Sequence, residues 1–190
     1  MKKIQRRPTT AFLPNPVVLV SVADGKGNGN FLTIAWAGTV CSSPPMVGIA
    51  VRPSRYSHGL LNAARDFVVN VPVAGQLEEV DVAGVWSGRE HDKFRELGFT
   101  PQRGSKVTAP LIAECPVNLE CVVRHQLALG SHDLFIGEVV AVHYDEDVTD
   151  SRGRLRPRAL RPITLVEGEY WALGERIGLY GAAARARGPR

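Results

Sequence analysis

Cysteine is scarce in this chain, with three residues among 190. None of the three lies in a Cys-x-x-Cys pair, and Cys115 and Cys121 would lie about 20 Å apart on one strand, too far for a disulfide. These features exclude a disulfide framework and favour a reducing compartment. We therefore predict a cytoplasmic protein.

Long apolar runs and metal-binding patterns are also absent. No run approaches the ~20 apolar residues that a membrane span needs. Pro14 and Pro16 interrupt the segment where a secretory signal would have its apolar core, so no signal peptide is expected. The five histidines include no His-x-x-x-His pair. We expect no membrane association and no metal.

Several enzyme signatures are missing as well. The glycine cluster from Gly25 to Gly29 lies in a predicted hairpin with no helix after it, so it is neither a dinucleotide fingerprint nor a P-loop. Ser131, His132 and Asp133 are adjacent, so their side chains point in different directions and cannot form a triad by themselves. No Gly-x-Ser-x-Gly motif is present. Hydrolase functions are disfavoured.

The net charge of +4 is mild, and much of the excess lies in arginines near 151–162 and 185–190. These segments lack interleaved aromatic residues that would stack on bases. An exposed loop and tail is the favoured interpretation, although a nucleic-acid-binding β-barrel stays open as an alternative. We expect no nucleic-acid partner.

What the chain does have is a series of short β-branched segments. Strands are expected over 16–22, 31–40, 45–51, 67–71, 133–144 and 163–166, with a bent strand or two over 111–129. Helices are expected over 57–64, capped by Ser54 or Ser57, over 76–85 and over 90–97, closed by Gly98. This pattern predicts a mainly β fold, an antiparallel barrel with a few short helices. Its size predicts one domain over 1–190, with an arginine-rich excursion near 151–162.

Small residues mark one segment as a candidate ligand edge. Thr33, Ala35, Ala37 and Gly38 let a flat ligand approach the backbone, whose N–H and C=O groups can bind the edge of a ring such as isoalloxazine. Thr33 and Ser42 add hydroxyl groups. The alternative is an ordinary barrel strand that happens to use small residues.

Two other segments combine hydroxyl groups with cations, as a phosphate dianion requires. Arg52-Pro-Ser-Arg-Tyr-Ser57 lies where a strand ends and a helix begins, so free helix N–H groups add to its guanidinium groups. The segment from Trp86 to Phe94 supplies Ser87 and Lys93. A capped helix with exposed arginines and a solvated helix start are the alternatives.

The strand over 132–142 carries three further candidates. Gly137 interrupts an apolar run, which predicts a bulge or close backbone packing. Glu138 is expected to be a partly buried, hydrogen-bonded structural carboxylate. His132 begins the strand, and an exposed turn histidine is the stronger interpretation unless a ligand lies there.

Taken in order, these segments resemble the flavin reductase-like family, the FMN-binding split barrels that include flavoredoxins. The features that carry the resemblance are Pro16–Ser21, Asn30–Trp36, Ser43–Pro45, Phe67–Pro72, His132–Val139 and the closing Tyr170–Gly174. The resemblance implies a Greek-key antiparallel split β-barrel, noncovalent FMN, and a homodimer with flavin near the interface.

The resemblance also implies roles for individual residues. The flavin ring is expected along Asn30, Leu32, Thr33, Ala35 and Trp36, with Cys41 and Ser42 close by. The ribityl phosphate is expected at Arg52, Ser54, Arg55, Ser57, Ser87 and Lys93. His132 is assigned to the nicotinamide or acceptor side as the catalytic residue. Cys41 is either a redox thiol or a small buried hydrophobe.

These roles predict an NAD(P)H-dependent flavin or ferric reductase that passes electrons through bound FMN. Its acceptor would be free flavin, a ferric chelate or a partner oxygenase. A flavoredoxin-like electron carrier, reduced by another protein, is the alternative. In both cases the flavin performs the redox chemistry, and the protein supplies placement and electrostatics.

Overall fold

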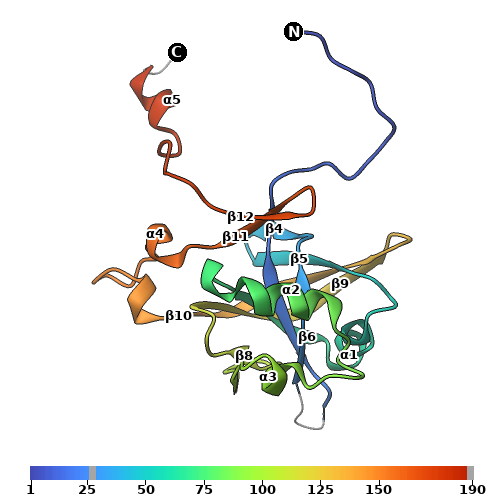
Figure 1. Ribbon diagram of the computed structural model, residues 1–190. Helices are drawn as coiled ribbons and strands as arrows, with labels where there is room; N and C mark the ends of the chain where they lie inside the picture. The colour runs from blue at the N-terminus through green and yellow to red at the C-terminus, as the bar shows by residue number, and fades with distance from the viewer. Residues whose placement is uncertain (26–28, 188–190) are drawn as a thin grey trace.

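The computed structural model describes residues 1–25 and 29–187 (Figure 1). Its centre is a curled seven-stranded antiparallel sheet with the strand order β3-β2-β6-β9-β10-β5-β4. The strands are β2 (Val18–Ala23), β3 (Gly29–Ile34), β4 (Ala37–Ser42), β5 (Pro45–Val51), β6 (Asp66–Val71), β9 (Val117–Ala128) and β10 (Asp133–Tyr144). The curl brings β3 into contact with β5. The predicted mainly β fold is confirmed.

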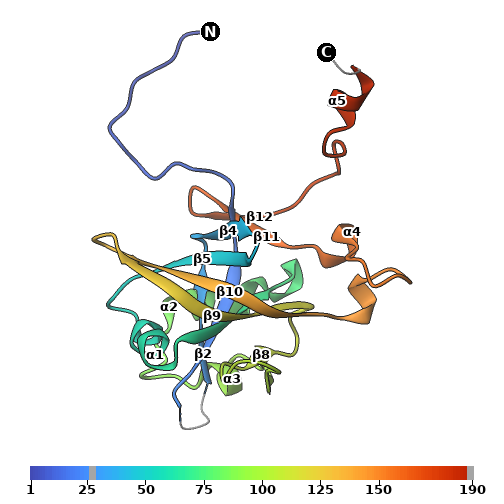
Figure 2. The same cartoon turned by 180° about the vertical axis from the view of Figure 1, so that it is seen from behind.

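Smaller elements surround this sheet. The helices are α1 (Tyr56–Ala64), α2 (Leu77–Val85), α3 (Lys93–Glu96), α4 (Pro157–Leu160) and α5 (Ala182–Ala186), with 3₁₀ turns at Ala74–Gln76 and Glu146–Val148. β1 (Asn15–Pro16), β11 (Ile163–Val166) and β12 (Glu169–Ala172) form one small sheet, and β7 (Pro101–Gln102) pairs with β8 (Leu111–Ile112). α2 packs on β3. It lies toward the viewer in Figure 1, whereas β9 and β10 lie toward the viewer in Figure 2, the view from behind.

Most expected elements are present, and β5, β10 and β11 have the predicted bounds. The expected segment 111–129 contains two strands, β8 and β9. The single strand over 31–40 was wrong, because the chain turns at Ala35 and Trp36 and crosses from one edge of the curled sheet to the other. The carbonyl of Trp36 accepts a hydrogen bond from Ala50 N–H there, at 2.9 Å. β12, which follows the last expected strand, was missed.

The helix starts also differ from expectation. Arg55 is the N-cap of α1 and makes no side-chain capping bond, so neither predicted serine cap is present. The helix expected from residue 90 begins at Lys93. The backbone N–H groups of Glu90 and His91 both bond to the Ser87 carbonyl and form a turn, and the Asp92 side chain then caps the helix. Gly98 follows this helix with φ +71°, as its predicted closing role requires. Part of the glycine-rich hairpin tip, residues 26–28, lies outside the described residues.

The barrel interior explains the glycine at position 137. Phe67 and Phe135 are fully buried in the main apolar cluster. A Cβ at Gly137 would lie 2.6 Å from Cζ of Phe67, and the β9–β10 register shifts between Ile136 and Gly137. Both predicted features, close packing and a bulge, are confirmed. Glu138 is bound to Arg124 at 2.7 Å, as expected of a structural carboxylate.

Buried polar side chains fasten the loop between β7 and β8 to the main sheet. The Glu120 carboxylate, fully buried, accepts backbone N–H bonds from Ser105, Lys106 and Val107. Asp66 accepts from the backbone of Thr108. Because buried carboxylates are costly unless hydrogen-bonded, these contacts fix the loop beside β6 and β9.

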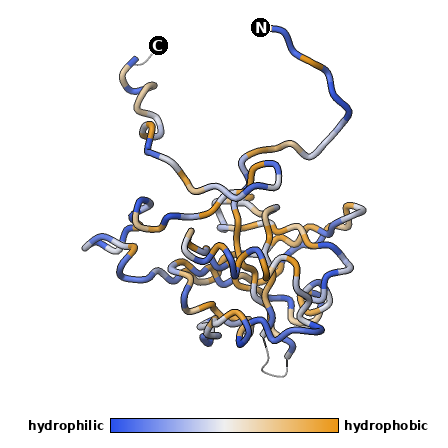
Figure 3. The backbone as a smooth tube through the Cα atoms, viewed as in Figure 1, coloured by the Kyte–Doolittle hydropathy of each residue, from blue (hydrophilic) through white to orange (hydrophobic). Residues whose placement is uncertain are grey.

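Both chain ends run outside the barrel as extended arms on the same side of the molecule (Figures 1 and 2). Residues 1–14 are exposed, including Phe12, and the C-terminal arm exposes Ile177 and Tyr180 almost completely. Apolar stretches are visible on both arms (Figure 3). Within the described residues, no helix has the length and hydropathy needed to cross a bilayer.

Candidate functional site

A pocket of about 610 Å³ lies where β3, the end of β5, the start of α1 and the 86–93 segment meet. We call it the cationic pocket, because Arg52, Arg55, Arg89 and Lys93 line it with a single acid, Glu90. Eight of the residues predicted to bind the cofactor line this pocket: Asn30, Leu32, Arg52, Ser54, Arg55, Ser57, Ser87 and Lys93. The structure therefore brings together segments that are up to 63 residues apart in the sequence.

The floor of the pocket is a small polar junction. Asn30 on β3 donates its Nδ2 proton to Oγ of Ser57 at 2.7 Å, and both residues are buried. Gly88 lies directly against Asn30, because a Cβ at this position would be 2.3 Å from Asn30 Oδ1. Only glycine fits there without moving the asparagine, which explains why this loop position has no side chain.

Lys93 has a more structural role than predicted. Its side chain is buried, and Nζ donates to the carbonyls of Phe31 and Ala83 at 2.8 Å each. Two of the three ammonium protons are thus used to tie α3 to β3 and α2. Burial, together with the nearby charge of Arg55, lowers the pKa of Lys93 from 10.5 to about 8. An anion bound in the pocket would stabilise the charged ammonium group and raise the pKa of Lys93 again.

The cations of the pocket are not neutralised by the protein. Across the described residues, Arg52, Arg55, Arg89 and Lys93 have no carboxylate within ion-pair distance. Arg55 also marks the N-terminus of α1, where free backbone N–H groups and the helix dipole favour an anion. Guanidinium, ammonium, hydroxyl and helix N–H donors together fit a phosphate dianion.

The outer edge of β3 adds main-chain groups to this site. The Phe31 carbonyl accepts a hydrogen bond from Lys93, so the backbone N–H and C=O of Phe31 point away from β2. Because this direction alternates along an antiparallel strand, the backbone groups of Thr33, two residues later, also point away from β2. The Thr33 hydroxyl instead donates to the Val80 carbonyl on α2. A ring ligand at this edge would therefore meet the Thr33 backbone, and the role of its hydroxyl in binding the ring stays a prediction.

Trp36 and His132, predicted separately, lie together near the same site. Their rings are 4.6 Å apart between centroids, with a tilt of 40°. Burial lowers the pKa of His132 from its ordinary value, and the charge of Arg52 lowers it further, which favours the neutral ring. Nδ1 of His132 lies 2.9 Å from Oγ of Ser131, which leaves Nε2 for a ligand.

Asp133 does not act on its neighbour His132. Its carboxylate is bound to Nε2 of His58 at 2.9 Å and to Nε2 of Gln126 at 3.1 Å. Ser131 and His132, expected to point apart, do contact one another, but Asp133 is bound to other residues, so the three do not form a triad. The hydrogen bonds from His58 and Gln126 lower the pKa of Asp133.

Five residues predicted to bind the cofactor do not line the cationic pocket: Thr33 and Trp36, described above, and Ala35, Cys41 and Ser42. Cys41 and Ser42 pair with Met46 and Pro45 at the far end of β5, about 20 Å along the strand from Arg52. Ala35 lies in the turn before Trp36. All three cysteines are free thiols, and Cys41 is partly exposed. Their flavin-ring roles stay predictions.

Five lining residues were not predicted as site residues: Tyr56, Trp86, Gly88, Arg89 and Glu90. The Arg89 guanidinium lies 5.7 Å from the centre of the Tyr56 ring, and Trp86 stacks on His91 at 4.1 Å. All five lie within the two segments that the sequence marked for phosphate, 52–57 and 86–94, but their residue types gave no separate signal. Among the described residues, no three His, Cys, Asp or Glu side chains form a metal-binding group.

Comparison with known proteins agrees with this arrangement. A family model described as "Flavin reductase like domain" matches residues 10–171. The chain belongs to the flavin reductase-like family. Flavoredoxin of Desulfovibrio vulgaris (Miyazaki F) is similar in structure, with a TM-score of 0.90 and 31% identity over 96% of this chain and 100% of that chain.

Two further similar proteins are informative. An FMN-binding protein from Thermus thermophilus has a TM-score of 0.79 and 27% identity, covering 94% of this chain and 98% of that one. An NADH-dependent FAD reductase from Streptomyces globisporus is 30% identical over 139 residues, 73% of this chain and 74% of the relative. The split-barrel fold expected for the family is confirmed.

Proposed function

We propose that this chain binds FMN with the phosphate in the cationic pocket and the ring along the outer edge of β3, toward Trp36 and His132. The observation that carries the proposal is the pocket's surplus of unpaired cations beside the α1 N-terminus. An FMN-binding protein of the same fold supports FMN as the flavin.

The protein's own residues would bind and orient the cofactor. Arg55 and Lys93 supply positive charge to the phosphate, while Ser54 and Ser87 supply hydroxyl donors. Asn30 holds Ser57 in place at the pocket floor. Bound FMN supplies the ability to accept a hydride and to release electrons.

We further propose that the protein is an NAD(P)H-dependent reductase. His132 lies beside Trp36 with a lowered pKa that favours its neutral ring, and it presents Nε2 to an incoming nicotinamide or electron acceptor. The NADH-dependent FAD reductase among the relatives supports this assignment. The acceptor would be free flavin, a ferric chelate or a partner oxygenase.

A flavoredoxin-like electron carrier is the second candidate, supported by the structural similarity to flavoredoxin. Anaerobic addition of NADH or NADPH to FMN-loaded protein separates the two. We expect bleaching of the flavin absorbance within seconds, slowed in His132→Ala. Absence of bleaching with both nucleotides, while a low-potential protein donor does reduce the flavin, would reject the reductase in favour of the carrier.

A homodimer is part of this proposal. Phe12 on the N-terminal arm and Ile177 and Tyr180 on the C-terminal arm are exposed side chains that a second copy would cover. Symmetric dimers are also the commonest homo-oligomers. Light scattering should report about twice the chain mass, and a monomer with FMN fully bound would contradict the dimer.

A further inference from the structure

The cationic pocket has two walls that come from distant parts of the chain. Arg55 and Ser57 belong to the wall at the start of α1, and Ser87 and Lys93 belong to the wall formed by the 86–93 segment. Both walls contact β3, which carries the pocket floor. A phosphate bound by groups of both walls would lose half of those groups if the walls separated.

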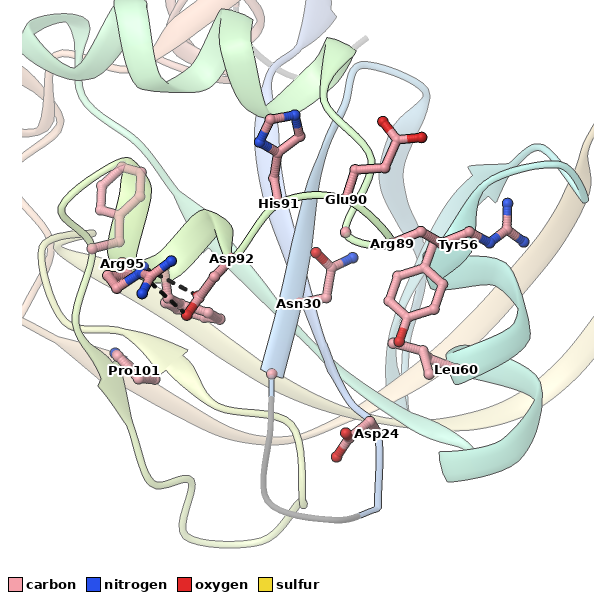
Figure 4. A pocket seen from close by; sticks show the side chains of 14 residues that line it. Asp24, Asn30, Tyr56, Leu60, Arg89, Glu90, His91, Asp92, Arg95 and Pro101 are labelled. Carbon is pink, nitrogen blue, oxygen red and sulfur yellow. Dashed lines mark hydrogen bonds and ion pairs between the residues drawn. The ribbon is translucent and has the colours of Figure 1, made fainter.

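A cation–π contact joins the two walls directly. The guanidinium of Arg89, in the 86–93 segment, lies 5.7 Å from the centre of the Tyr56 ring. Tyr56 is the first residue of α1 and stands between Arg55 and Ser57 in the sequence. In Figure 4 the Arg89 side chain extends from its loop across Tyr56. A guanidinium at this distance is attracted to the negative face of the aromatic ring.

Arg89 and Tyr56 also close one side of the cationic pocket. Both residues line this pocket and a neighbouring pocket of about 640 Å³, which Figure 4 shows, so they form part of the partition between the two. Across the described residues, Arg89 has no carboxylate within ion-pair distance. The position of its guanidinium therefore depends on the Tyr56 ring.

The 86–93 segment is anchored near its ends. The Trp86 ring stacks on the His91 ring at 4.1 Å, and Lys93 is buried and bound to the Phe31 and Ala83 carbonyls. Residues 89 and 90, in the middle of the segment, are exposed. The Arg89 side chain thus links the exposed part of this wall to the opposite wall.

We infer that Tyr56 and Arg89 form a clasp that keeps the FMN phosphate between the two walls and so sets how slowly the cofactor is released. When the clasp opens, the exposed middle of the 86–93 segment can move away from α1 and let the phosphate leave. FMN then stays bound from one turnover to the next, as a retained cofactor and not as an exchanging substrate. This inference rests on the proposed function, because it uses the same phosphate position.

Rates of FMN release from the FMN-loaded, full-length protein test the clasp, with excess apoflavodoxin as the trap for released flavin. Tyr56→Leu removes the aromatic ring but no charge, and Tyr56→Phe keeps the ring as the matched control. Arg89→Met removes the guanidinium. Arg158→Met on α4, in an exposed residue that lines neither pocket, controls for the loss of an arginine. The double variant of Tyr56→Leu and Arg89→Met shows whether the two side chains act together.

Tyr56→Leu should release FMN about fivefold faster than the parent, as expected for the loss of an exposed cation–π contact, and Tyr56→Phe should match the parent. Arg89→Met should release FMN at least about fivefold faster, and adding Tyr56→Leu to it should cause no further increase. Arg158→Met should have no effect. Riboflavin has no phosphate to be trapped, so its release rate should be the same in all these proteins. The parent should keep its FMN through gel filtration.

Several results would overturn the clasp while leaving FMN binding intact. These are a parent rate in Tyr56→Leu, equal acceleration in Tyr56→Leu and Tyr56→Phe, or increases that multiply in the double variant. Equally faster release of riboflavin would show general loosening of the pocket and would also overturn it, as would loss of FMN from the parent on gel filtration. A parent that binds no FMN at all would overturn the proposed function, and this inference with it.

Discussion

Nε2 of His58 lies 2.9 Å from Oδ2 of Asp133, and both side chains are nearly buried. His58 follows Ser57 at the floor of the cationic pocket, and Asp133 follows His132 at the start of β10. The pair therefore joins the proposed phosphate site directly to the proposed nicotinamide side.

This pair predicts a functional effect of Asp133→Asn. His58 would lose its charged partner, so the first turn of α1 and the start of β10 would be held less firmly. We expect reduction by NADH to slow about tenfold, a change of about 1.4 kcal/mol. Stopped-flow reduction checks this. Asp150→Asn, which removes a carboxylate paired with Arg154 on a distant loop, is the control and should have no effect.

Gly88→Ala should disrupt the pocket floor. The new Cβ would collide with Asn30 Oδ1 and break the hydrogen bond from Asn30 to Ser57. We expect FMN affinity to fall about tenfold, equivalent to about 1.4 kcal/mol. Gly59→Ala in α1, where a Cβ meets no atom within 4 Å, is the matched control and should bind FMN normally. Equal affinities in the two variants would show that Asn30 can move freely.

Glu120 should control stability at acid pH. Burial alone would raise its pKa, but hydrogen bonds from Ser105, His143 and Lys106 outweigh burial and lower the pKa from 4.5 to about 2. The ionised carboxylate then stabilises the folded state by about 3 kcal/mol above pH 4.5, and this contribution is lost as the pH falls toward 2.

Urea unfolding of the parent and of Glu120→Gln at pH 7 and pH 3 measures this contribution. We expect the variant to be less stable at pH 7 and to lose less stability on acidification. Glu138→Gln, in a partly exposed pair with Arg124, is the control and should resemble the parent. A Glu120→Gln profile parallel to that of the parent would contradict the assignment.

Lys93 predicts a pH dependence of FMN binding. Its pKa is about 8 in the free protein, and a phosphate in the pocket would raise it, so FMN binds the protonated form. The apparent dissociation constant for FMN should therefore rise about fivefold between pH 8 and pH 9, as the protonated fraction falls. Riboflavin, which lacks the phosphate, should show no such rise over the same range. The same rise in the dissociation constants of both flavins would show that Lys93 does not act on the phosphate.

Local sequence patterns predicted much of the fold but missed features that depend on distant contacts. The bounds of β5, β10 and β11 follow from β-branched runs between turn residues. The turn at Ala35 and Trp36 has no local marker, because the small residues there also suit a strand. The turn depends instead on a contact with a later strand, the hydrogen bond from Ala50 N–H on β5 to the Trp36 carbonyl.

The candidate site was likewise predictable where it depends on local sequence and not where it depends on distant contacts. Hydroxyl and cationic segments identified most of the pocket lining, since these residue types are unusual together at a helix start. The burial of Lys93 was not predictable, because its acceptors belong to β3 and α2, 62 and 10 residues away. The pairing of His58 with Asp133 spans 75 residues and has no sequence signature.

The most direct test of FMN binding through the cationic pocket is a titration of flavin-free protein with FMN and with riboflavin, in the parent and in Arg55→Ala. Arg55 is exposed and makes no side-chain cap, so its removal should leave α1 intact. A charged hydrogen bond contributes roughly 1.5–3 kcal/mol. We predict that the parent binds FMN at least about tenfold more tightly than riboflavin, and that Arg55→Ala loses about tenfold in FMN affinity but none for riboflavin. Equal affinity of the parent for the two flavins, or no binding of either, would contradict the account.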